Sequence, residues 1–419
     1  MTEPIEARLE AAGLPPLPRH CWLEIDVAAL AHNLGVVRSM IGAGVEINAV
    51  VKADAYGHGI EAAARAFVDA GADRLCVAAL DEALHLRSVG VKAPLLVLFA
   101  VPAEHVALAA EAGIELTLAE EATARDALAG WRAARREGEL AVHLEMETGL
   151  ARAGLRADRV ADVCREALAT PGVRVAGLWS HLASPHDEAF TAGQLAEFER
   201  AVAALTSAGL PVPRRHLAAS GGLLSGRVPA YEGVRPGLML YGLAPEDLPL
   251  SADGVQAAAS LRPAMALKCR PLRIEDVPAG TPVGYGGRWR AERPSRVATL
   301  PVGYGDGWSR SYQPGAQALV RGRRVPLVGT VAMDAVMIDV TDVPGVDLAD
   351  EFVLLGRQGG EEITAGELAR ARNTISWEIV TTMAQRVPRV YHAPTVLLDV
   401  RTLGGELRKA SGAVHRGEK

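Results

Sequence analysis

Several apolar runs of this chain are followed directly by side chains that can do chemistry. Lysine, histidine and carboxylate groups can attack a carbonyl or move a proton, and arginine can bind a carboxylate or phosphate. Taken alone, each type is common on a protein surface, where long side chains extend their charged ends into water. It is therefore more informative that these side chains repeatedly follow an apolar run. They are Lys52 after the first run, Glu145 and Arg152 after the fifth, His181 after the sixth, Ser220 after the seventh and Arg235 after the eighth.

The apolar runs alternate with Ala-rich amphipathic segments, which predicts strands followed by helices. Eight such units predict an α/β fold with a closed (β/α)8 barrel of the TIM type, whose reactive groups lie at the C-terminal ends of the strands. An open doubly wound sheet would instead have a Gly-rich fingerprint after its first strand. The predicted strands are residues 47–51, 75–79, 95–99, 114–118, 141–145, 175–180, 215–219 and 233–235, and the predicted helices include 60–70, 81–89, 103–112 and 194–208.

The pattern changes in the last third of the chain, where short apolar runs are separated by Gly, Pro and Asp turns. This predicts a second, mostly β domain with a single helical stretch around residues 364–383. We therefore divide the chain into an N-terminal segment (1–21), a barrel (22–255) and a C-terminal β domain (256–419), with the linker at 245–254. The predicted strands of the second domain are residues 297–300, 318–320, 325–328, 336–340 and 351–355.

The composition of the chain argues against several classes of function, including nucleic-acid binding and membrane attachment. The chain has 419 residues, 49% of them hydrophobic, and a net charge of −6, which does not favour binding to nucleic acid. Its N-terminus is acidic and polar and no apolar run has the length of a membrane span, so we expect a cytoplasmic protein without membrane attachment. The four cysteines are scattered without metal-type spacing, which is typical of reduced thiols and predicts no metal site.

Longer motifs make the chain resemble the alanine racemases, enzymes of fold type III that depend on pyridoxal 5'-phosphate. The resemblance covers both predicted domains, so it implies the barrel followed by a β domain. Its motifs are Ala49-Val-Val-Lys-Ala-Asp-Ala-Tyr-Gly-His-Gly59, Glu147-Thr-Gly-Leu-Ala-Arg-Ala-Gly154, Gly177-Leu-Trp-Ser-His-Leu-Ala183, Gly233-Val-Arg-Pro-Gly-Leu-Met-Leu-Tyr-Gly242, Val283-Gly-Tyr-Gly-Gly287, Gly303-Tyr-Gly-Asp-Gly307, Gly329-Thr-Val-Ala-Met-Asp334 and Arg386-Val-Pro-Arg-Val-Tyr391.

The resemblance implies a two-base reaction on a small amino acid, L- or D-alanine. Lys52 would hold the cofactor as a Schiff base and then act as the base on one face of the substrate. Tyr285 of the partner subunit would act on the other face, with His181 as its neighbour, so the enzyme would be a homodimer with composite active sites. Arg235 would complete this network and face the pyridine nitrogen. Because a guanidinium donates a hydrogen bond but hardly a proton, the ring nitrogen would stay neutral and reaction at the wrong carbon would be limited.

The remaining site residues also follow from the resemblance. Tyr56, Ser220, Trp377 and the main chain at Gly237 and Leu238 are expected to bind the cofactor and its phosphate. The substrate is expected to meet a second set, formed by Arg152, Met333, Asp334 and Tyr304.

Several positions depart from the family pattern. Many members have a carbamylated lysine at the position of Glu145, and a glutamate would supply the anion directly. We therefore expect Glu145 to pair with Arg152; the alternative is a carboxylate that merely ends a strand in solvent. Three further differences leave the substrate open: Trp377 in place of a tyrosine, Ala219 in place of an asparagine and Thr330 in place of an arginine. A fourth is His186, which stands where an acidic residue is common.

Other functions of the same fold make different demands on the sequence. Racemisation of serine, 2-aminobutyrate or another small amino acid would use the same groups. A barrel-type decarboxylase would have a cysteine-containing loop in the second domain, whereas Cys269 lies in Lys268-Cys-Arg270, away from such a motif. A non-catalytic cofactor-binding protein would be a single barrel and would leave the second domain, with Tyr285, unexplained.

Overall fold

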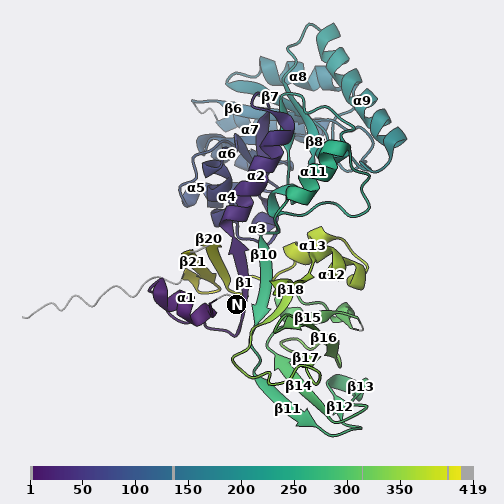
Figure 1. Ribbon diagram of the computed structural model, residues 1–419. Helices are drawn as coiled ribbons and strands as arrows, with labels where there is room; N and C mark the ends of the chain where they lie inside the picture. Colours follow the sequence, from purple (N-terminus) through teal and green to yellow (C-terminus); the bar gives the residue numbers. More distant parts are fainter. Residues whose placement is uncertain (1–2, 135–136, 314, 394–395, 407–419) are drawn as a thin grey trace, which may run out of the picture. The chain divides into compact units, whose positions relative to one another are not determined.

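The computed structural model describes residues 3–134, 137–313, 315–393 and 396–406, and within residues 29–262 eight parallel strands close into a barrel (Figure 1). The strands are rich in Val, Leu and Ala because parallel strands covered by helices are buried on both faces. Pairing of Glu46 with Gly233 closes the ring. The predicted barrel is therefore confirmed. Its strands are β2 (Glu46–Val50), β3 (Arg74–Val77), β4 (Leu95–Val97), β5 (Ile114–Leu118), β6 (Leu140–Glu145), β7 (Val173–Trp179), β8 (Arg214–Ala219) and β9 (Gly233–Arg235).

Helices connect successive barrel strands and lie outside them. The four helices predicted from apolar spacing are present, and the structure adds further helices that the sequence pattern did not single out. The helices are α2 (Val27–Ile41), α3 (Lys52–Tyr56), α4 (Ile60–Asp69), α5 (Leu80–Ser88), η1 (Ala103–His105), α6 (Val106–Glu111), α7 (Glu121–Ala134), α8 (Val160–Ala169), α9 (Glu188–Ser207), α10 (Ser220–Ser225), η2 (Leu238–Tyr241) and α11 (Ala252–Ser260).

Polar side chains occupy part of the barrel interior. Hydrogen bonds join β3 to β5 through Arg74 and Glu115, and β6 to β8 through His143 and His216. These strands are not neighbours in the barrel, so the side chains meet on its inner face, where strands two apart still approach each other. Barrels of this type are usually filled by layers of aliphatic side chains. The interior of this barrel is filled partly by polar side chains instead.

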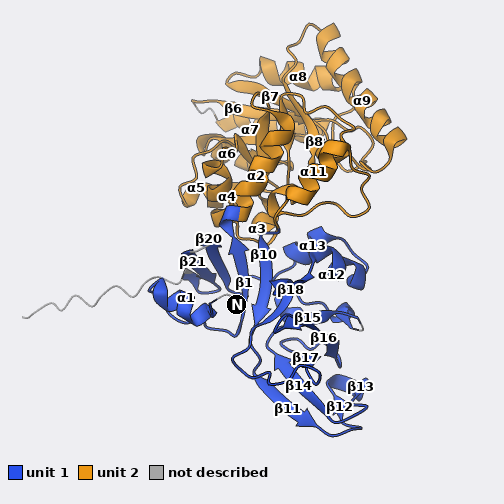
Figure 2. Ribbon diagram, in the orientation of Figure 1, with its two compact units in different colours: residues 1–28, 263–419 blue, residues 29–262 orange. Residues whose placement is uncertain are grey.

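A long twisted sheet forms the second compact unit, made of residues 1–28 and 263–419 (Figure 2). Its strand order is β11-β14-β17-β16-β15-β18-β10-β1-β20-β21-β22, and β19 pairs with β18. The strands are β1 (Cys21–Asp26), β10 (Met265–Cys269), β11 (Arg273–Val277), β14 (Ser295–Leu300), β15 (Gln317–Val320), β16 (Arg323–Val328), β17 (Val336–Asp339), β18 (Phe352–Gln358), β19 (Glu361–Ile363), β20 (Arg389–Ala393), β21 (Val396–Thr402) and β22 (Gly405–Glu406). The short pair β12 (Pro282–Val283) and β13 (Trp289–Arg290) is separate, and one-turn helices are η3 (Tyr285–Gly287), η4 (Tyr304–Asp306) and η5 (Arg310–Tyr312).

The compact units divide the chain differently from the sequence-based domains. Strand β1, which the sequence assigned to the barrel, pairs with β10 through Trp22 and Lys268 and with β20 through Glu24 and Val390. Both of its edges are thus used by strands of the β unit. The segment predicted as a linker, residues 245–254, is partly helical. Ser251 caps α11 by accepting a hydrogen bond from the Gly254 N–H (3.0 Å), so the helix begins inside this segment. The barrel unit continues to residue 262.

The helical stretch predicted at residues 364–383 is two helices rather than one. Helix α12 (Ala365–Arg372) ends at Asn373, whose φ of 55° is left-handed, and α13 (Ser376–Thr381) follows. Asparagine tolerates this conformation better than most residues and commonly ends a helix in this way. The expectation of a single helix was wrong because apolar spacing continues across the break.

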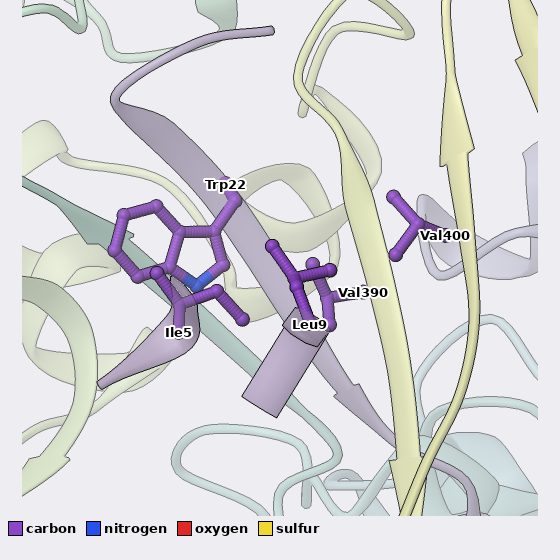
Figure 3. Packing of buried hydrophobic residues seen from close by; sticks show 5 residues of the cluster. All are labelled: Ile5, Leu9, Trp22, Val390 and Val400. Atoms are coloured by element: carbon purple, nitrogen blue, oxygen red, sulfur yellow. The ribbon is translucent and has the colours of Figure 1, made fainter. Parts of the chain in front are cut away.

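The N-terminal helix α1 (Ile5–Ala11) covers the β1, β20 and β21 end of the sheet (Figure 3). Ile5 and Leu9 are four residues apart and therefore lie on one helix face, where both are 1% exposed. They pack with Trp22, Val390 and Val400 into one apolar cluster. The helix is thus an integral part of the β unit.

The described residues contain neither a membrane-spanning helix nor a cluster of metal-ligand side chains. Among the described residues, no helix has both the length and the apolar composition needed to cross a membrane. In the same part of the chain, no group of three or more His, Cys, Asp or Glu side chains is arranged to hold a metal ion.

We predict that Leu9→Ala lowers the free energy of unfolding of the β unit by about 2–5 kcal/mol, because it opens a cavity in a buried cluster. Urea unfolding followed by circular dichroism measures the change. Glu10→Ala, at an exposed position of the same helix, is the matched control. Equal stability of the Leu9→Ala variant and the wild type would contradict the packing role of α1.

Candidate active site

Lys52 begins a short left-handed turn at the end of the first barrel strand. The next four residues, Ala53, Asp54, Ala55 and Tyr56, have φ values of 53–54°, in the left-handed region. This conformation costs an L-residue roughly 1–2 kcal/mol, so surrounding groups must hold it. The turn sends the side chains of Lys52 and Tyr56 in directions that a right-handed helix would not give.

Glu82 is one of the groups that hold this turn. One carboxylate oxygen accepts from the Ala53 N–H (2.6 Å), and the other accepts from the N–H groups of Ala78 (2.8 Å) and Ala79 (3.1 Å). Asp54 adds a second restraint by accepting from the Ile60 N–H (2.9 Å). Sequence reasoning missed Glu82. Its signal is an acidic residue in the first turn of the helix that follows the second barrel strand.

The environment of Lys52 favours its neutral amine. Burial, followed by the positive charge of Arg152, lowers the pKa of the Lys52 amine below its usual value, while the nearby Glu82 carboxylate opposes the shift. A larger fraction of the amine is therefore unprotonated near neutral pH than for a lysine in water. A neutral amine can attack a carbonyl or accept a proton.

Donor groups that suit a phosphate gather beside this turn. The Tyr56 ring stacks on Tyr241 with 4.8 Å between ring centres, and a Cβ at Gly237 would lie 2.5 Å from the Tyr56 hydroxyl. The Ser220 hydroxyl oxygen accepts from the N–H groups of Gly237 (3.1 Å) and Met239 (3.3 Å). Glycine is therefore required where the hydroxyl meets the main chain. Hydroxyl and main-chain N–H donors without a carboxylate are the groups that bind phosphate oxygens.

Arg235 is buried at the C-terminal end of β9, with only 3% of its surface exposed. Nη1 donates to His216 Nδ1 (2.9 Å) and to the His216 carbonyl, and Nη2 donates to the carbonyls of Ser180 and Leu217. Its guanidinium lies over the Trp179 ring, 4.5 Å from the ring centre. Burial lowers the pKa of Arg235 to about 10, so the group remains a cation at neutral pH.

Arg152 and Glu145 form the expected ion pair. Arg152 Nη2 lies 3.3 Å from Glu145 Oε1, and the guanidinium is 5.5 Å from the centre of the Phe99 ring. The Arg152 side chain is 38% exposed, whereas Glu145 is buried. Burial raises the pKa of Glu145, and its Oε2 atom has no hydrogen-bond partner among the described residues. The pair thus presents an accessible arginine on a fixed carboxylate.

His181 lies in the loop that follows β7, and the buried side chain of Gln194 holds this loop in place. Gln194 Nε2 donates to the His181 carbonyl (3.2 Å) and to the Thr148 hydroxyl (3.0 Å), while its Oε1 accepts from the Ala183 N–H (2.8 Å). Burial and then the charge of Arg235 lower the pKa of His181 to about 3, so its imidazole is neutral at physiological pH. Gln194 was not singled out from the sequence, although a buried glutamine on an amphipathic helix is a signal of such a role.

The other predicted site residues lie in the β unit. Tyr285 is 75% exposed, and its carbonyl accepts from the hydroxyl of the buried Thr330 (3.1 Å). Tyr304 and Met333 are also exposed, and main-chain hydrogen bonds connect their loops. The Tyr304 N–H donates to the Ala332 carbonyl (3.1 Å), and the Gly305 N–H donates to the Met333 carbonyl (2.9 Å).

Asp334 and Trp377 complete the predicted set of the β unit. Arg386 bridges Asp334 (2.6 Å) and the fully buried Asp306 (2.8 Å), which fixes the loop that carries Asp334. Trp377 is half-buried on α13. The barrel unit therefore assembles the predicted cofactor groups Lys52, Tyr56, Ser220, Arg235, Gly237 and Leu238 with Glu145, Arg152 and His181, and the β unit carries the rest.

The chain matches known proteins over most of its length. Residues 25–245 match the family model described as alanine racemase, N-terminal domain, and residues 264–391 match the alanine racemase C-terminal domain. The alanine racemase of Symbiobacterium thermophilum is 40% identical over 381 residues, covering 90% of this chain and 98% of that protein. That of Halothermothrix orenii is 36% identical, covering 90% and 97%.

Solved structures agree with the sequence relatives. The alanine racemase from Bacillus anthracis with bound L-Ala-P is 33% identical and aligns with a TM-score of 0.84 over 92% of this chain and 98% of that chain. The alanine racemase from Streptomyces coelicolor is 32% identical, with a TM-score of 0.82 over 89% and 98%. With both domains matched in order and the barrel and sheet in place, the chain belongs to the alanine racemase family.

Proposed function

We propose that this chain interconverts L- and D-alanine, with Lys52 and Tyr285 as the two proton carriers and pyridoxal 5'-phosphate as the cofactor. The observation that carries the proposal is the Lys52 turn, which combines an amine of lowered pKa with the Tyr56, Ser220 and Gly237 donors and a buried arginine in one unit. Family membership supports the same activity.

The residues present fit this cofactor. Lys52 would bind its carbonyl carbon, Tyr56, Ser220 and the main chain near Gly237 and Leu238 its phosphate, and Arg235 its ring nitrogen. Pyridoxal phosphate, when bound, would spread the negative charge that remains on the α-carbon after a proton is removed. The close approach of the Tyr56 hydroxyl to Gly237 supports this fit, because a side chain at position 237 would collide with the hydroxyl and displace it.

The protein groups supply the proton transfers. The neutral amine of Lys52 takes a proton from one face of the α-carbon, and its lowered pKa makes this form available near neutral pH. Tyr285 serves the opposite face. Its exposed ring is accessible to a second subunit, and we propose a homodimer in which each site combines Lys52 of one chain with Tyr285 of the other. The neutral imidazole of His181 would accept a hydrogen bond from that phenol.

Arg152 would bind the substrate carboxylate, since its guanidinium is accessible and fixed on one side by Glu145. Glu145 would orient this arginine with its own carboxylate, so that no carbamylated lysine is needed at this position. Tyr304, Met333 and Asp334 of the β unit would limit the size of the substrate, and Trp377 would add its indole N–H near the phosphate. We place the reaction in the cytoplasm, where D-alanine would serve cell-wall precursors.

We predict that Lys52→Ala loses covalently bound cofactor and all racemisation, because Lys52 supplies the amine of the proposed site. Tyr285→Phe should keep the cofactor but slow exchange of the α-proton of one alanine enantiomer by about 100- to 10,000-fold more than that of the other. NMR of each enantiomer in D2O measures the two exchange rates. Tyr231→Phe, a tyrosine outside the proposed site, is the matched control.

The same assay tests the substrate. Values of kcat/KM across alanine, serine and 2-aminobutyrate should be highest for alanine, and a higher value for another amino acid would replace alanine in the proposal. Equal slowing of both enantiomers by Tyr285→Phe would contradict the two-base assignment.

We predict that His181 remains neutral in the folded enzyme at pH 5, since its pKa is about 3. An unfolded chain protonates this histidine near pH ~6.5, so His181 lowers stability progressively as pH falls from ~6.5 towards ~3. NMR titration of the ring checks the folded value. Urea unfolding between pH 5 and pH 8 should show a weaker pH dependence for His181→Gln than for the wild type. A ring that titrates near its unfolded value would refute the assignment.

We predict that co-expression of Lys52→Ala and Tyr285→Phe chains restores activity that neither has alone. A mixed dimer holds both defects in one site and none in the other, so random pairing should give about one quarter of wild-type activity. Mixing Lys52→Ala with itself under a second tag is the control. Absence of any recovery in isolated mixed dimers would rule out composite sites.

A further inference from the structure

A continuous row of polar side chains crosses the interior of the barrel from its N-terminal to its C-terminal end. Arg74 at the start of β3 binds Glu115 (2.9 Å), Glu115 contacts His143 Nε2 (2.7 Å), and His143 Nδ1 contacts His216 Nε2 (3.0 Å). His216 Nδ1 then accepts from Arg235 (2.9 Å) at the end of β9. Both histidines are buried, at 1% and 3% exposure. The proposed mechanism uses only the last member of this row.

The barrel makes room for the contact between the two histidines. Gly177 lies on β7 between their strands, and a Cβ there would be 2.1 Å from His143 Nδ1 and 2.9 Å from His216 Nε2. Any larger residue at this position would separate the rings. Since Gly177 has an ordinary φ, the space it leaves for the rings, and not its conformation, accounts for glycine at this position.

Hydrogen-bond chemistry assigns every proton in the row. Arginine only donates, so His216 Nδ1 must accept and His216 Nε2 must carry the proton. That proton is donated to His143 Nδ1, which leaves the proton of His143 on Nε2, where it is donated to the Glu115 carboxylate. Both imidazoles are then neutral. Burial lowers the pKa of each histidine, in agreement with neutral rings. Burial by itself would raise the pKa of Glu115, but the hydrogen bonds that it accepts from His143 and Arg74 lower that pKa to about 2.

The row links the buried Arg235 cation to a carboxylate through hydrogen bonds, in addition to the direct charge interaction of Arg235 with Glu145. Among the described residues, the hydrogen-bond partners of Arg235 are carbonyl oxygens and the His216 ring, without a carboxylate. The nearest carboxylate connected to it by hydrogen bonds is Glu115, two imidazoles away. All dipoles in the row point the same way, so the anion at one end makes His216 Nδ1 a stronger acceptor for the cation at the other.

We propose that Glu115 is a positioning residue for Arg235 and acts through His143 and His216, whose tautomers it fixes. The catalytic meaning of this inference rests on the proposed function, in which Arg235 faces the nitrogen of the cofactor ring. The row does not conduct protons, because the guanidinium at its end stays protonated at neutral pH. It fixes where the guanidinium donates, and a misplaced donor would weaken catalysis without weakening substrate binding at Arg152.

The experiment compares Glu115→Leu, Glu115→Gln and Gly177→Ala with Glu46→Gln in the holoenzyme. Leucine removes the acceptor, glutamine keeps an acceptor of the same size without charge, and alanine forces the two rings apart while leaving the Glu115 carboxylate in the protein. Glu46 is the matched control, because it also binds Arg74 (3.2 Å) but lies outside the row to Arg235. NMR of 15N-histidine-labelled protein reads the tautomers, and kinetics give kcat and KM for alanine.

We expect His143 and His216 to carry their protons on Nε2 in the wild type and in Glu46→Gln. Glu115→Leu and Gly177→Ala should give mixed tautomers at His216 and lower kcat about 10- to 100-fold with KM within about twofold, because a displaced donor affects the reacting centre and not the substrate carboxylate. Glu115→Gln should fall between them and the wild type.

An unchanged His216 tautomer with kcat within about twofold of wild type in Glu115→Leu would overturn the proposal. If that variant does not fold, Glu115→Gln and Gly177→Ala decide by the same readouts, and normal values in both would overturn it equally. The tautomers are measured without turnover, so a wild type that did not racemise alanine would reject the proposed function and leave the test of the row intact.

Discussion

The left-handed turn after the first barrel strand is the constraint on which the site depends. Four consecutive residues with positive φ cost about 4–8 kcal/mol together, a large part of the net stability of a domain. Main-chain N–H groups that donate to the carboxylates of Glu82 and Asp54, together with hydrogen bonds within the main chain, hold this turn in place. In return, the side chains of Lys52 and Tyr56 leave a single short turn; in the proposed function the amine serves the reacting carbon and the phenol binds the phosphate.

The polar interior of the barrel is a second departure from the most stable arrangement. Aliphatic layers would pack the inside of such a barrel without any need to satisfy buried charges. Here Arg74, Glu115 and two histidines occupy that space and end on a buried arginine. The barrel thus gives up part of its apolar core in order to hold one cation in a fixed place near its C-terminal end.

The sequence predicts the barrel well because its strands are buried on both faces and appear as compact apolar runs at regular intervals. The long motifs identify the family, and the Glu145–Arg152 pair was expected because Glu145 stands where many members of that family have a carbamylated lysine. The assignment of β1 was not accessible, because a short strand does not show which sheet its edges will join. Glu82, Gln194 and Glu115 were missed for a related reason, since each acts on groups distant in sequence.

The β unit is made from both ends of the chain, and this affects how the protein is synthesised. Strand β1 leaves the ribosome early, but its neighbours β10 and β20 follow only after the whole barrel has emerged. During translation β1 therefore has two open edges that could pair with another nascent chain. A truncation before residue 389 would leave one of these edges open permanently, so premature termination would yield an aggregation-prone product even with the barrel intact.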